Sequence, residues 1–128
     1  MLKRENNILL TKVDAYSNRI IRLYKYLKDE EKEFILSKQL LRSGTSIGAN
    51  IAESQSAQSS ADFIHKLEVA LKEAKETHYW IEKLLVGEYI NEVGYKSMSN
   101  DNVEIIKLLT SIIITKKRNI SNGLDVKY

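Results

Sequence analysis

The feature that most constrains the fold is a regular apolar repeat between residues 63 and 84. Its members follow one another at steps that alternate between four and three residues: Phe63, Leu67, Ala70, Ala74, Thr77, Ile81 and Leu84. This spacing keeps every member on one side of an α-helix, while charged residues fill the other positions. Alanines in such a stripe allow neighbouring helices to approach closely. The segment is therefore predicted to be a helix of a bundle or coiled coil.

The other segments are typical of long helices as well. Residues 7–28 carry a second stripe with steps of four and three: Leu9, Val13, Tyr16, Ile20, Leu23 and Leu27. A further helix is predicted over residues 31–54, because the acidic run 29–31 suits a helix amino terminus. A fourth helix ends near residue 118 or 119, and its first half, with Gly94 and the polar run 97–102, is poor helix material. Either Ser59 or Ser60 can cap the third helix.

Proline is absent from all 128 residues, which fits helices without interruption. Short connections between long helices favour antiparallel neighbours. We therefore predict an all-α fold, an antiparallel up-down-up-down four-helix bundle that self-associates. Residues 1–120 would form one domain and residues 121–128 a flexible tail.

The amino terminus lacks the apolar stretch of a signal peptide, and cysteine is absent, which excludes disulfides and thiolate metal sites. The most apolar segment, residues 105–114, is much shorter than the ~20 residues that cross a bilayer. We expect a cytoplasmic protein that does not bind a membrane.

The centre of the second predicted helix contains two glycines, Gly44 and Gly48. Each costs a helix about 1 kcal/mol relative to alanine. Either another backbone approaches closely there and offsets this cost, or the helix breaks into a loop. The residues alone leave both alternatives open.

Metal or catalytic chemistry is not indicated by the sequence. His65 and His78 lie thirteen residues apart, which places them about 20 Å from each other along one helix. The sequence shows no nucleophile elbow or phosphate loop, and Glu73, Glu76 and Glu82 read as a solvated face that alternates with lysines. We predict that the protein is not an enzyme and needs no cofactor or metal; a metal-dependent bundle enzyme is a remote alternative.

Four polar residues of the second helix form a motif, namely Arg42, Ser46, Asn50 and Glu53. Asn50 and Glu53 lie one helical turn apart, and Arg42 lies about two turns before Asn50. We interpret the motif as a hydrogen-bonded patch that sets helix register, with a ligand site as the alternative.

Positive charge is concentrated towards both ends of the chain. Residues 8–28 carry five basic residues against one acidic residue, whereas residues 29–57 and 58–88 each sum to −2. In the predicted topology the first and fourth helices are neighbours, so their cations would share one side of the molecule. The candidate phosphate-binding residues are Arg19, Arg22, Lys25, Lys28, Lys116, Lys117 and Arg118. The alternative is that these cations serve only solubility.

Several motifs resemble the bacterial four-helix-bundle family of proteins encoded by intervening sequences in 23S ribosomal RNA genes. The similar stretches are Ser46-Ile47-Gly48-Ala49-Asn50-Ile51-Ala52-Glu53 with Arg42 and Ser43 before them, and residues 61–67 and 70–77. The family also includes the accessory variability protein of diversity-generating retroelements. Many relatives continue this motif with glycine and arginine, whereas the present chain has Ser54 and Gln55, which removes a positive charge.

The resemblance implies that the second helix continues through its glycines, that the bundle assembles into a homopentameric ring, and that the protein has no enzymatic activity. For the retroelement members it implies an adaptor that binds reverse transcriptase and nucleic acid. The leading hypothesis is therefore a homo-oligomeric adaptor that contacts RNA or DNA, or an enzyme acting on them. The alternative is a protein–protein scaffold without a nucleic-acid role.

Overall fold

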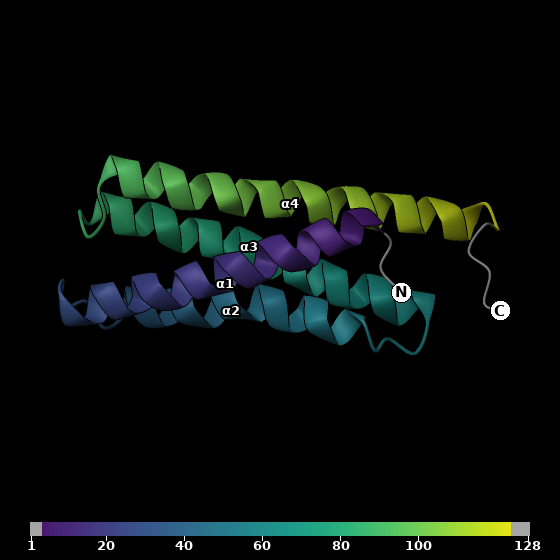
Figure 1. Cartoon of the computed structure of the whole chain (residues 1–128), viewed down its shortest axis with the longest axis horizontal. Coiled ribbons are helices and arrows are strands. Elements are labelled where there is room, and N and C mark those ends of the chain that lie inside the picture. Colours follow the sequence, from purple (N-terminus) through teal and green to yellow (C-terminus); the bar gives the residue numbers. More distant parts are fainter. Residues whose placement is uncertain (1–3, 124–128) are drawn as a thin grey trace.

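The computed structural model describes residues 4–123, and side chains from Asn7 onwards. Within this range it contains four helices: α1 (Arg4–Asp29), α2 (Leu36–Ser54), α3 (Ser60–Val86) and α4 (Glu92–Ser121). Each helix packs on the next along the chain, and α4 packs on α1, while the diagonal pairs do not touch (Figure 1). The predicted antiparallel up-down-up-down bundle is confirmed. Helix α4 includes Ser121, and the rest of the predicted flexible tail lies, from residue 124 on, outside the described residues.

The predicted apolar stripes form the core. The α3 repeat is buried throughout, and in the α1 stripe only Leu23 is half-buried rather than buried. Helices α2 and α4 complete the core with Leu40, Ile47, Ile51, Met98, Ile105, Leu109 and Ile113. No helix in the described part of the chain is long and apolar enough to span a membrane.

Helix α2 passes through Gly44 and Gly48 without interruption. A Cβ atom added to Gly44 would lie 2.7 Å from Cγ2 of Ile20 on α1, and one added to Gly48 would lie 2.9 Å from Oγ of Ser17. The glycines therefore allow the close approach of α1, which packs its side chains directly against the α2 backbone. This resolves the two alternatives in favour of close approach, and the interruption into a loop is wrong.

The start of α2 differs from the prediction: the helix begins at Leu36, not at residue 31. Lys32 adopts a left-handed conformation with φ of 54°, which turns the chain between α1 and α2. The buried Glu33 carboxylate then accepts hydrogen bonds from the backbone N–H groups of Ile35 (3.0 Å), Leu36 (2.8 Å) and Ser37 (2.7 Å). Glu33 thus replaces the expected acidic first turn as the group that satisfies the amino terminus of α2.

The first half of α4 is helical despite its poor propensity. Asn91 caps the helix by accepting a hydrogen bond from the Gly94 N–H at 2.8 Å. Three polar side chains of the following turns then bind other helices: Ser97 binds Arg19, Ser99 binds His78, and Asn102 binds Tyr16. Tertiary hydrogen bonds therefore stabilise a segment that local propensity disfavours. At α3, Ser59 is the cap, as one of the two candidates, and its Oγ accepts from the Asp62 N–H at 3.0 Å.

Substitution of Gly44 by alanine should lower the free energy of unfolding by about 2 kcal/mol, measured by urea denaturation. The added methyl group would collide with Ile20, and this outweighs the gain in helix propensity. In Gly94→Ala, the methyl group faces only the exposed Asn91 side chain at 3.3 Å, so a change below about 0.5 kcal/mol is expected. In the double variant Gly44→Ala/Ile20→Ala, the losses should sum to less than the two single losses. A Gly44→Ala protein as stable as the wild type would contradict the close contact.

Glu33→Gln should destabilise the protein by about 1 kcal/mol at pH 7, because a neutral amide accepts these backbone bonds less strongly. Burial alone raises the pKa of Glu33, but the bonds from Leu36, Ser37 and Ile35 outweigh it, so the folded-state pKa lies below its ordinary value. A carboxyl with a lowered pKa stabilises the fold above its unfolded-state pKa, and this stabilisation is lost as the pH falls through the folded-state pKa. The difference in urea stability between wild type and Glu33→Gln should therefore shrink as the pH falls below about 4. Glu30→Gln, at an exposed carboxylate, is the control and should stay within about 0.5 kcal/mol of wild type.

Candidate nucleic-acid interface

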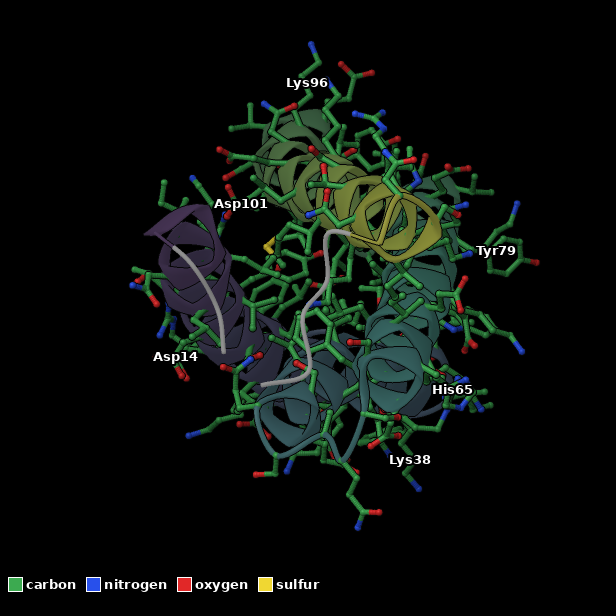
Figure 2. The ribbon with its side chains drawn as sticks, turned by 90° about the vertical axis from the view of Figure 1, so that its right-hand side faces the viewer. Asp14, Lys38, His65, Tyr79, Lys96 and Asp101 are labelled. Carbon is green, nitrogen blue, oxygen red and sulfur yellow. The ribbon has the colours of Figure 1, made fainter. Side chains whose placement is uncertain are left out.

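Arg19, the first of the predicted phosphate-binding residues, is used inside the bundle. Its guanidinium donates to Asp101 Oδ2 at 2.6 Å and to Ser97 Oγ at 2.8 Å, both on α4. In Figure 2, Asp101 lies on the side of α4 that faces α1. Arg19 is half-buried and holds α1 against α4, so little of its charge is left for a partner.

Two further polar contacts join α1 to α4. The Asn102 amide donates to the Tyr16 hydroxyl at 3.0 Å in the core, and Lys12 pairs with Glu104 at 2.7 Å. Burial raises the pKa of Tyr16 strongly, and the bond from Asn102 counteracts only part of this. Asn102 Oδ1 is buried and accepts no hydrogen bond from the described residues. The α1–α4 contact, the smallest between neighbouring helices, is therefore largely polar.

The other six predicted cations divide into engaged and exposed residues. Lys28 lies over the Tyr24 ring, 5.5 Å from its centroid; Lys116 lies 5.6 Å from the Phe63 ring; and Lys117 pairs with Glu68 of α3 at 2.8 Å. The remaining three are exposed and make no ion pair with a described residue: Arg22, Lys25 and Arg118.

The two basic segments lie on neighbouring helices, as predicted, but at opposite ends of the bundle (Figure 1). The carboxyl-terminal half of α1 meets the amino-terminal half of α4, where Arg19 binds Asp101. Lys117 lies sixteen residues further along α4, about 24 Å away. The expectation of one shared basic surface is therefore wrong, because antiparallel packing separates segments that each lie near a helix carboxyl terminus.

The longest cationic surface follows α4 alone. Between residue 105 and its end at Ser121 the helix has no acidic residue and four cations: Lys107, Lys116, Lys117 and Arg118. Lys96, Lys107 and Arg118 are spaced by eleven residues, close to three helical turns, so they form one exposed line along the helix. Figure 2 shows Lys96 pointing away from the bundle. Lys107 and Arg118 border a shallow hollow together with Thr110, Ser111 and Ile114.

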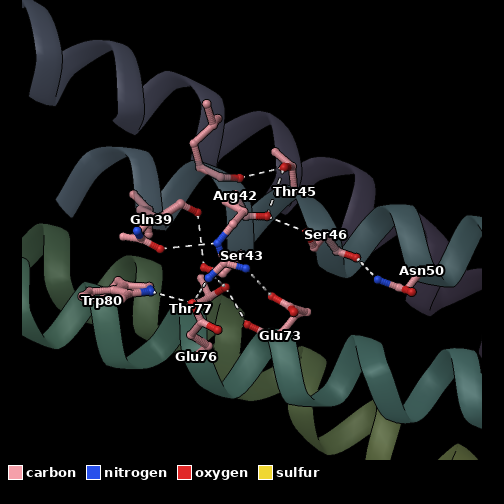
Figure 3. A network of polar contacts seen from close by, with 12 residues as sticks. Gln39, Arg42, Ser43, Thr45, Ser46, Asn50, Glu73, Glu76, Thr77 and Trp80 are labelled. Carbon is pink, nitrogen blue, oxygen red and sulfur yellow. Dashed lines mark hydrogen bonds and ion pairs between the residues drawn. The ribbon is translucent and has the colours of Figure 1, made fainter. Parts of the chain in front are cut away.

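The Arg42 motif connects α2 to α3 (Figure 3). The Arg42 guanidinium contacts Glu73 at 3.4 Å and Glu76, and Glu76 also accepts a hydrogen bond from Trp80 Nε1 at 2.9 Å. At the other end of the motif, Glu53 pairs with Lys66 of α3 at 3.2 Å. The interpretation of Glu73 and Glu76 as a solvated face alternating with lysines is therefore wrong. Sequence spacing placed them on α3 but gave no signal of which helix they face.

Ser46 and Asn50 bind the backbone of their own helix. Ser46 Oγ donates to the Arg42 carbonyl at 2.7 Å, and Asn50 Nδ2 donates to the Ser46 carbonyl at 2.9 Å. One turn away, the buried Thr77 hydroxyl donates to Ser43 Oγ at 2.9 Å across the α2–α3 interface. All four motif residues thus have partners within the bundle, a geometry that suits a role in helix register better than an open ligand site.

The two histidines are apart, as the spacing predicts. His78 is half-buried, with Nε2 2.9 Å from Ser99 Oγ and Nδ1 2.9 Å from Glu82 Oε1. His65 is exposed on α3 and is visible at the edge of the bundle in Figure 2. Among residues 4–123, no three histidine, aspartate or glutamate side chains gather closely enough to hold a metal ion.

Comparison with known proteins gives a family and a solved structure. A family model described as 23S rRNA-intervening sequence protein matches residues 5–111. The crystal structure of a protein of unknown function, from the S23 ribosomal protein family of Bacteroides thetaiotaomicron VPI-5482, is 57% identical and superposes with a TM-score of 0.84. The match covers 85% of this chain and 97% of that chain. No curated protein matches the chain.

Arg42→Ala should lower the free energy of unfolding by about 1 kcal/mol, because it leaves the carboxylates of Glu73 and Glu76 near each other without their shared cation. Trp80 is the only tryptophan and is bonded to Glu76, so its fluorescence should shift as well. Lys38→Ala, which removes an exposed cation from the same helix, is the control and should leave both readouts unchanged. Adding Glu73→Gln to Arg42→Ala should recover part of the loss; a further loss would contradict this electrostatic explanation.

Proposed function

Because the chain belongs to the 23S rRNA-intervening sequence protein family, we propose that it is a cytoplasmic, non-enzymatic adaptor that self-associates and contacts nucleic acid. One observation carries the nucleic-acid part of this proposal. The carboxyl-terminal half of α4 has no acidic residue, and Lys107 and Arg118 stand exposed there beside a shallow hollow. A phosphate backbone that follows this helix would meet only positive or neutral side chains.

This surface suits affinity without sequence reading. Lysine and arginine on a helix surface neutralise phosphates and release counterions, which gives binding that weakens as salt rises. Arg22 and Lys25 at the other end of the bundle would provide a second, separate contact. The net charge of +3 and the pI near 9.0 agree with a modest electrostatic attraction.

Self-association is supported by apolar side chains that the bundle leaves outside its core. Three of the most exposed are Val93 (78%), Ile35 (76%) and Val86 (75%), and all lie in or beside the two loops at one end of the bundle (Figure 1). Tyr26 and Phe34 extend this apolar end. Exposed apolar groups of this kind favour protein contacts. We propose a homopentamer as the assembly, which is the state implied by the family resemblance.

A protein–protein scaffold without nucleic acid is the second candidate, and the same apolar end favours it. Its partner could be a reverse transcriptase, as implied for the retroelement relatives, or another protein. The two candidates differ in whether the cations of α4 contribute to binding.

Light scattering should give the mass of a pentamer, and this mass should increase when a short RNA strand or DNA duplex is added at low salt. The gain should disappear as salt rises, because each phosphate contact depends on counterion release. Lys107→Glu should reduce the slope of log affinity against log salt by about 0.7–0.9, the contribution of one phosphate contact. Lys38→Glu makes the same charge change on the exposed side of α2 and should leave the slope unchanged. A pentamer that ignores nucleic acid would favour the scaffold, and a monomer would overturn the assembly.

A further inference from the structure

Helix α3 is net acidic in sequence, but each of its five acidic residues is engaged within the bundle. Glu73 and Glu76 bind Arg42 of α2, and Glu68 binds Lys117 of α4. Glu82 contacts His78 one turn away, and Asp62 accepts from the Gln58 N–H at 3.2 Å. Most of the negative charge of α3 is therefore balanced by cations of the neighbouring helices.

The lysines on the outward side of α3 are not balanced in this way. Lys72 and Lys75 are exposed and form no hydrogen bond or ion pair with another described residue. Together with Tyr79 and Lys83 they follow steps of three, four and four residues, so they lie on one side of the helix. The outward face of α3 is thus cationic, although the helix as a whole is acidic.

An aromatic ring lies within this line of lysines. The Tyr79 side chain is half-exposed and points away from the bundle (Figure 2). Its ring packs edge-on against Trp80 at a centroid distance of 5.0 Å, and Lys83 Nζ lies 5.0 Å from the Tyr79 ring centroid. Trp80 is itself fixed by its hydrogen bond to Glu76. The Tyr79 ring is therefore held against a fixed neighbour, with its phenol end in solvent and cations around it.

We infer that the outward face of α3 binds single-stranded nucleic acid, with Tyr79 stacking on a base and Lys72, Lys75 and Lys83 contacting phosphates; this rests on the proposed function and names the strand type and the residues. Unpaired bases offer a ring face that a duplex hides within its stack, and an exposed tyrosine among lysines recognises that combination. Base stacking on an aromatic side chain tolerates any base, which agrees with a surface that reads no sequence. Ion pairs between α3 and α4 place this face next to the cationic line of α4.

Fluorescence anisotropy with a labelled 12-nucleotide oligo-uridine strand, and with a duplex of the same length, tests the inference. Wild-type protein should bind the strand more tightly than the duplex at equal salt, and binding of unlabelled strand should quench Trp80, which lies against Tyr79. Tyr79→Ala should weaken strand binding about 10-fold or more and leave duplex binding unchanged, whereas Tyr79→Phe should retain it. Tyr26→Ala, at another half-exposed tyrosine, is the control and should have no effect.

A charge comparison completes the experiment. The double reversal Lys72→Glu/Lys75→Glu should weaken strand binding more than the equal charge change Arg22→Glu/Lys25→Glu on α1, with circular dichroism verifying that both fold. If the wild type binds the strand but Tyr79→Ala binds equally well, or if only the α1 variant is impaired, the inference is wrong while the proposed function stands. If the wild type binds neither strand nor duplex, the nucleic-acid role itself fails and the inference fails with it.

Discussion

The packing of Ile20 on the backbone of α2 at Gly44 is the contact on which the other helix positions depend. No side chain larger than hydrogen fits between them, so α1 lies closer to α2 than ordinary helix packing allows. Glycines that cost stability in an isolated helix are thus offset by the dispersion contacts that their absence of a side chain permits. This position of α1 also brings Tyr16 and Arg19 within hydrogen-bonding distance of Asn102 and Asp101 on α4. A wider α1–α2 spacing would move these donors and acceptors out of reach.

The two outer interfaces of the bundle are specified by different means. Helix α2 meets α3 through a broad apolar contact with a buried Ser43–Thr77 hydrogen bond and the Arg42 network at its edge. Helix α1 meets α4 through fewer contacts, and polar groups make up much of them. Polar pairs add little net stability but disfavour every register in which they are unpaired, because a buried unsatisfied group costs about 1–3 kcal/mol. The polar residues that weaken the helix propensity of α4 therefore help to fix where α1 packs on it.

The surface of the bundle shows why charge must be counted by face rather than by segment. Helix α1 has the largest excess of cations, yet Arg19 and Lys12 are paired with α4. Helix α3 is net acidic, yet its acids pair with neighbouring helices and its lysines remain outside. A partner meets the field of the charges that remain unpaired at the surface, so the electrostatic character of a helix follows from its neighbours as much as from its own residues.

The periodic spacing of apolar residues was sufficient to predict four helices, their antiparallel order and most of the core, because side-chain direction in a helix depends only on residue number. The family motif further implied the continuity of α2 through Gly44, and the structure supplies the reason in Ile20. The start of α2 was not predictable, since it depends on the left-handed Lys32 and on Glu33 folding back over Ser37. Nor were the partners of Glu73, Glu76 and Arg19, or the separation of the two basic segments. Those features arise between helices, where the rotation and the end-to-end placement of one helix against another decide which charges meet, and a local pattern holds no record of either.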